Sequence, residues 1–123
     1  MDTTTTLAEL RNQVAAFIAA RHWQVYHTPK SLTMSIAIEA AELMEQFQWH
    51  GNAASRAAAQ EPERLTAVAD ELADVLIYAL TLANTLDLDV SDAITGKLAR
   101  NEHRYPPGHL PSRFNLPETD TLD

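Results

Sequence analysis

Residues 35–49 have the sequence SIAIEAAELMEQFQW, and this stretch decides the fold. It is rich in alanine and other apolar residues and holds no glycine or proline, which favours a helix. Two acids, Glu39 and Glu42, stand three residues apart among the apolar side chains. A second apolar stretch, residues 70–78 (DELADVLIY), carries an acidic pair at the same spacing. The sequence therefore predicts two apolar helices that each present a pair of carboxylates.

The four acids, Glu39 and Glu42 with Glu71 and Asp74, are spaced so that they can share one site. Helical residues three apart lie about 60° apart around the axis, so each pair projects from one face. If the two helices are antiparallel neighbours, the four carboxylates converge. Two like charges about 4 Å apart repel by roughly 4 kcal/mol at an effective dielectric constant near 20. The cluster therefore requires either protonation or a bound divalent cation.

Acidic pairs at this spacing are common on solvated helix faces, and that interpretation stays open for either pair alone. The apolar neighbours of both pairs favour the metal site instead. Oxygen ligands without cysteine favour Mg²⁺, with Mn²⁺ as a substitute. A di-iron bundle is excluded because no glutamate is followed three residues later by histidine. A phosphate-binding P-loop is excluded because the three glycines are scattered.

Length and composition predict one all-α domain. A chain of 123 residues can bury roughly two-thirds of its unfolded surface. Its three glycines and its many alanines and leucines favour helix over sheet. We expect the domain to cover residues 1–106, followed by an extended or disordered tail over residues 107–123, which could lie across a neighbouring subunit.

The net charge of −8 excludes a basic surface for nucleic acid polymers, so an anionic substrate would need cations to bind. No apolar run is long enough to predict a membrane span, and no signal peptide is indicated. With no cysteine, disulfides, zinc thiolate sites and cysteine nucleophiles are excluded. The composition fits a reducing compartment, and we expect a cytoplasmic protein.

Local signals predict four long helices. The first begins near Thr6, which has capping-box spacing to Glu9, and runs to about residue 21. Pro29 places the segment 23–30 in a connector. The remaining long helices are predicted over residues 32–49, from Pro62 to about residue 86, and over residues 90–104.

Three predictions concern the helix ends. Ser31 is expected to be the N-cap of the second helix, and Asp89 that of the fourth. Gly51 is expected in a left-handed conformation after the second helix. Residues 53–60 are expected to form either a short helical turn or a mobile loop.

The two acidic motifs resemble the signature of a known family. Glu39-x-x-Glu42 and Glu71-x-x-Asp74, separated by 28 residues, resemble the signature of the MazG-like all-α nucleoside triphosphate pyrophosphatases, and most closely that of the dCTP pyrophosphatases. Further matching motifs are Arg21-x-Trp23-x-x-x-His27-x-Pro29-Lys30-x-Leu32, Phe47-Gln48-Trp49 and Lys97-x-x-x-Asn101-x-x-Arg104-Tyr105-Pro106. The similarity covers about residues 17–106.

The resemblance implies a four-helix bundle assembled as a homodimer or dimer of dimers. It implies magnesium-dependent cleavage of a nucleoside triphosphate, with dCTP or a modified dCTP preferred, to monophosphate and pyrophosphate. The four acids would be catalytic metal ligands, and either Glu42 or Glu45 could instead activate the water. The expected substrate-binding residues are Trp23, His27 and Trp49 around the base, with Tyr78, Lys97, Asn101 and Tyr105 on the phosphates or sugar.

Purely structural roles are also possible for some of these residues. Tyr78 could equally be a core residue, and the stripe formed by Lys97, Asn101 and Tyr105 could be a solvated face. Two rival functions also remain open. One is a non-enzymatic helical interaction module, and the other is the same fold acting on dUTP or another phosphorylated substrate.

Overall fold

The computed structural model describes residues 1–108, which form helices and no β-strand. The all-α prediction is confirmed for this part of the chain. The predicted tail beyond residue 108 lies outside the described residues. No helix in the described part is both long enough and apolar enough to cross a bilayer. The elements are α1 (Leu7–Ala20), a 3₁₀ turn η1 (Trp23–Tyr26), α2 (Pro29–Glu45), α3 (Asn52–Ala58), α4 (Pro62–Thr85) and α5 (Val90–Arg104).

Three helices begin where local chemistry predicts. Thr6 caps α1 through a capping box, in which the Glu9 N–H donates to the Thr6 hydroxyl and the Thr6 N–H donates to Glu9 Oε2 at 2.6 Å. The Thr6 N–H and the Thr6 hydroxyl both donate to the Glu9 carboxylate, and these two hydrogen bonds lower the pKa of Glu9. Pro62 occupies the first turn of α4, and the Asp89 carboxylate caps α5 by accepting from the Asp92 N–H at 2.8 Å.

The bounds of α2 differ from the prediction at both ends. The N-cap is Thr28 and not Ser31, because Pro29 takes the first helical position, where its missing N–H is harmless. The Thr28 hydroxyl accepts from the Ser31 N–H at 3.1 Å, and the Ser31 hydroxyl donates to the Tyr26 carbonyl. At the other end, α2 stops at Glu45, and the chain reaches Trp49 through turns.

The prediction that Gly51 is left-handed is wrong. Its φ of −70° and ψ of 171° are extended, and it precedes α3 as the N-cap residue. The short helical turn expected over residues 53–60 exists as α3. Among the non-glycine residues described, the left-handed ones are His22 and Asp87, which end α1 and α4. These two residues allow the chain to reverse without glycine.

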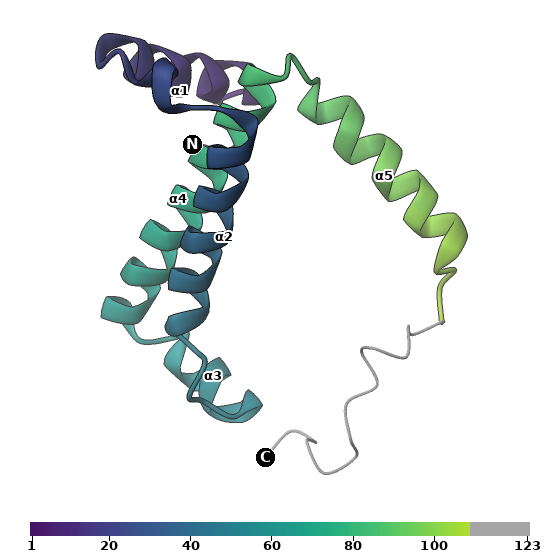
Figure 1. Cartoon of the computed structure of the whole chain (residues 1–123). Coiled ribbons are helices and arrows are strands. Elements are labelled where there is room, and N and C mark those ends of the chain that lie inside the picture. Colours follow the sequence, from purple (N-terminus) through teal and green to yellow (C-terminus); the bar gives the residue numbers. More distant parts are fainter. Residues whose placement is uncertain (109–123) are drawn as a thin grey trace.

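The antiparallel helices α2 and α4 form the central layer, and α1 packs across α4 (Figure 1). Leu32 on α2 is fully buried, and Thr81 and Ala83 on α4 are also buried. Arg11 and Asn84 join α1 to the end of α4 through two hydrogen bonds, of 2.8 and 3.1 Å. This frame fixes the faces of α2 and α4 toward each other.

Helix α5 stands apart from the central pair (Figure 1). Its apolar residues Ile94 and Leu98 are 53% and 61% exposed. Leu72 and Leu76 on α4 are also exposed. The four predicted long helices are present. However, α5 does not complete the predicted four-helix bundle with the other helices of the same chain.

Candidate metal and nucleotide site

The contact between α2 and α4 brings the predicted acids together. Glu39 and Glu42 come from α2, and Glu71 comes from α4; one carboxylate oxygen from each lies within 4.8 Å of the others. Oxygen ligands of one Mg²⁺ at about 2.1 Å would be roughly 3 to 4 Å apart. The three glutamates need only small side-chain movements to reach that spacing, so they fit a divalent cation.

The electrostatics of the cluster also fit a cation. Partial burial raises the pKa of Glu39, and the neighbouring charges of Glu42, Asp74 and Glu71 raise it further. Partial burial likewise raises the pKa of Glu71, with added repulsion from Glu42 and Asp74. Both shifts have the sign expected for carboxylates that repel one another. A divalent cation would relieve this repulsion.

Asp74 lies close to the cluster but outside the group of three glutamates. Its charge acts on Glu39 and Glu71, and its side chain also lines a cavity of about 200 Å³ between α1, η1 and α4. Trp23, His27 and Tyr78 line the same cavity. The acidic cluster and this aromatic-lined cavity are thus adjoining, with Asp74 at their boundary.

His27 and Tyr78 meet edge to face, with ring centroids 6.5 Å apart. The Nδ1 atom of His27 is buried and has no hydrogen-bond partner in the described part of the chain. Buried polar atoms are usually paired, so this nitrogen is available for a ligand or water. A larger cavity, of about 440 Å³, shares His27 but contains no acidic side chain. Because a substrate would have to lie beside the acidic cluster, the smaller cavity is the better candidate for the substrate pocket.

Trp23 is held by its neighbours and remains 43% exposed. Its ring packs edge to face with Phe17 at 5.7 Å, and the Arg21 guanidinium lies 3.6 Å from the Phe17 ring centroid. Phe17 also lines the smaller cavity, and the sequence did not single it out for this site. Its position three residues before the end of α1, and six residues before Trp23 in the sequence, was the available signal.

The structure does not bring all the predicted residues to this site. Trp49 is 89% exposed at the end of the turns after α2. Lys97, Asn101 and Tyr105 lie on or at the end of α5, which stands apart from α2 and α4. A single chain therefore leaves one side of the site without these groups.

Residues 34–109 match the model of the MazG-like family. The chain belongs to the MazG-like family. The match spans the acidic pairs of both helices and the whole of α5. It thus confirms the resemblance drawn from the acidic motifs.

Individual relatives agree with this assignment. The chain is 38% identical to the dCTP pyrophosphatase 1 of Rattus norvegicus over 101 residues, which is 82% of the chain and 59% of the relative. It is 36% identical to dCTP pyrophosphatase 1 of Homo sapiens over 85% of the chain and 61% of the relative. The chain therefore spans about three fifths of these relatives.

A solved structure described as a pyrophosphatase, from Archaeoglobus fulgidus, has a similar fold. It superposes with a TM-score of 0.76 and is 39% identical. The similarity covers 81% of this chain and 92% of that one. Sequence and fold thus point to the same family.

Proposed function

We propose that this protein is a magnesium-dependent nucleotide pyrophosphohydrolase that cleaves a deoxynucleoside triphosphate, preferably dCTP or a modified dCTP, to the monophosphate and pyrophosphate. The observation that carries the proposal is the group of three glutamates within 4.8 Å, next to a cavity lined by aromatic side chains. The relatives, which are dCTP pyrophosphatases and a pyrophosphatase, support the reaction class and the nucleotide.

Glu39, Glu42 and Glu71 would hold the metal, with Asp74 as a fourth ligand or as the group that orients it. A Mg²⁺ ion held by these residues would neutralise negative charge on the phosphates and would supply an activated water. In the reaction, a water oxygen bonds to the α-phosphorus, and the bond to the pyrophosphate leaving group breaks. Either Glu45, or Glu42 in place of its role as a metal ligand, would accept the proton of that water.

The base would enter the cavity of about 200 Å³ beside Asp74. Trp23 offers a partly exposed ring for stacking, which contributes roughly 1–3 kcal/mol per base. The Nδ1 of His27, which has no hydrogen-bond partner among residues 1–108, offers one polar contact that could select between bases. Tyr78 lines the same cavity and shares the α4 face of Asp74, so it can reach the sugar or a phosphate.

A second copy of the chain would complete the site as a homodimer or dimer of dimers. The exposed Ile94 and Leu98 of α5, together with Leu72 and Leu76 of α4, form apolar surface that monomeric proteins usually bury. When α5 packs on a partner, its Lys97, Asn101 and Tyr105 can reach the partner's phosphate site. Trp49, exposed in one chain, would also find cover in such an assembly.

A nucleotide panel tests this function. Purified protein is incubated with each nucleoside triphosphate, with and without Mg²⁺, and pyrophosphate and orthophosphate are measured separately. The proposal predicts pyrophosphate release that requires Mg²⁺ and is fastest with dCTP or a modified dCTP. Orthophosphate release would contradict the mechanism, faster cleavage of dUTP would contradict the substrate, and no turnover would favour the interaction module.

A further inference from the structure

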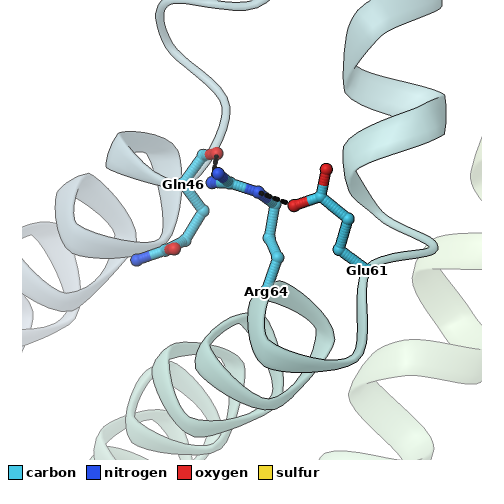
Figure 2. Close-up of polar contacts among 3 residues, drawn as sticks. All are labelled: Gln46, Glu61 and Arg64. Atoms are coloured by element: carbon cyan, nitrogen blue, oxygen red, sulfur yellow. Dashed lines mark hydrogen bonds and ion pairs between the residues drawn. The ribbon is translucent and has the colours of Figure 1, made fainter.

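Arg64 links the two acidic helices at the end of their contact. It lies in the first turns of α4, and its Nη1 donates to the backbone carbonyl of Gln46 at 2.6 Å (Figure 2). Gln46 is the C-cap residue of α2, directly after the last helical residue, Glu45. One side chain of α4 thus holds the end of α2.

The contact lies in line with the acidic cluster. Gln46 follows Glu42 by four residues, so the two lie on one face of α2. Arg64 precedes Glu71 by seven residues, or about two turns, and shares its face of α4. The Gln46–Arg64 contact therefore lies beyond Glu42 and Glu71 along the same faces of the two helices.

The carbonyl contact outweighs the ion pair of Arg64. Carbonyls in the last turn of a helix lack an intrahelical partner, and a cationic donor is favourable at this end. By contrast, Arg64 Nε is 3.7 Å from Glu61 Oε2, and the Glu61 side chain is 65% exposed. Exposed ion pairs contribute little.

We infer that Arg64 is a positioning residue of the metal site: by capping the end of α2 from α4, it fixes Glu42 opposite Glu71. This inference rests on the proposed function, because it assumes that the glutamates bind the metal. Without the cap, the last turn of α2 frays, and Glu42 loses its fixed position. The metal site then weakens although every ligand is still present.

The test compares four variants of the intact protein. Arg64→Met removes the donors but keeps an apolar stem of similar length, and Arg64→Lys keeps one cationic donor. Glu61→Gln removes only the ion pair, and Arg56→Met removes the same charge from an exposed position on α3 as a matched control. For each, Mn²⁺ affinity without nucleotide is measured, together with the Mg²⁺ dependence of pyrophosphate release and hydrogen exchange of the amides of residues 42–48.

Arg64→Met is expected to weaken Mn²⁺ binding by about tenfold, the scale seen when groups that orient metal ligands are removed. It should shift half-saturation by Mg²⁺ equally, leave kcat at saturating Mg²⁺ unchanged, and speed exchange at residues 42–48. Arg64→Lys should recover most of the affinity, and the other two variants should match the wild type.

A folded Arg64→Met protein with wild-type Mn²⁺ affinity would overturn the inference and leave the proposed function standing. Failure of Arg64→Met to fold, with a normal Arg64→Lys, would assign the side chain to folding and also overturn it. A wild-type protein that neither binds Mn²⁺ nor releases pyrophosphate would overturn the proposed function and this inference together.

Discussion

Glu42 and Glu71 come from different helices, and their carboxylate oxygens lie within 4.8 Å of each other. Glu39 completes the group, and Asp74 adds charge from the same side. In the metal-free protein, repulsion among these carboxylates therefore opposes folding. The contact between α2 and α4 holds like charges together, and their repulsion lowers the free energy of unfolding. Substitutions in the cluster should therefore change stability as well as activity.

Glu71→Gln is expected to stabilise the metal-free protein at pH 7. The pKa of Glu71 is raised in the folded state, so the folded carboxyl holds its proton more tightly than the unfolded one. Its ionisation consequently destabilises the fold as the pH rises above the unfolded value, and the full cost is present above the folded pKa. Removing the charge should raise the Tm at pH 7 in EDTA.

The gain in Tm should shrink as the pH falls through the carboxylate range and vanish once both states are protonated. Thermal unfolding of wild type and Glu71→Gln between pH 3.5 and 8 measures it. Glu63→Gln, an exposed acid in the first turn of the same helix, is the control. A lower Tm for Glu71→Gln in EDTA at pH 7 would contradict the electrostatic account.

Mg²⁺ is expected to stabilise the wild-type protein and not Glu39→Gln. A ligand that binds only the folded state at 100 times its Kd adds about 2.7 kcal/mol of stability. The Tm of the wild type should rise with Mg²⁺ concentration, and the control Glu63→Gln should follow it. An equal rise in Glu39→Gln would show that the cation binds elsewhere.

Trp23→Ala should raise the KM for the nucleotide by about tenfold or more, since a stacked base is worth roughly 1–3 kcal/mol. Trp23→Phe keeps an aromatic ring and should retain most of the affinity. Because Trp23 also packs on Phe17, the Tm of each variant separates lost stability from lost binding. An unchanged KM in a folded Trp23→Ala protein would remove Trp23 from the base site.

Mixing two inactive variants tests whether α5 serves a partner chain. Glu39→Gln lacks a metal ligand, and Lys97→Met lacks the expected phosphate contact. In a randomly paired homodimer, an equal mixture should regain about a quarter of wild-type activity if Lys97 acts on the partner's site. The mixture would stay inactive if Lys97 acted within its own chain. Leu98→Glu should dissociate the assembly, as measured by light scattering.

Local signals predicted much of the fold. The Thr6 capping box, Pro62 and the Asp89 cap each fixed a helix start through neighbouring atoms alone. Thr28 was missed although Pro29 marked it, because Ser31 is an equally good capping residue. The end of α2 was missed for a different reason: the Arg64 contact with Gln46 joins positions 18 residues apart. No local pattern encodes that contact.

The candidate site likewise has features that the local sequence predicted and features that depend on tertiary contacts. Spacing predicted the glutamate cluster, because two helices with acids at three-residue intervals have few ways to pack. It did not predict that Asp74 also borders the aromatic-lined cavity, or that Phe17 lines it. Helical periodicity also could not reveal that Lys97 and Tyr105 lie away from the acids. It shows which residues share one face of α5, but not which helix that face contacts.

The most direct test of the metal site is pyrophosphate release from dCTP by Glu39→Gln, compared with Glu63→Gln at equal Mg²⁺ and with the fold of both checked by circular dichroism. Glu39→Gln should be folded and should release no pyrophosphate above background, whereas Glu63→Gln should match the wild type. Full magnesium-dependent activity in folded Glu39→Gln would contradict the assignment of the acidic cluster as the catalytic metal site.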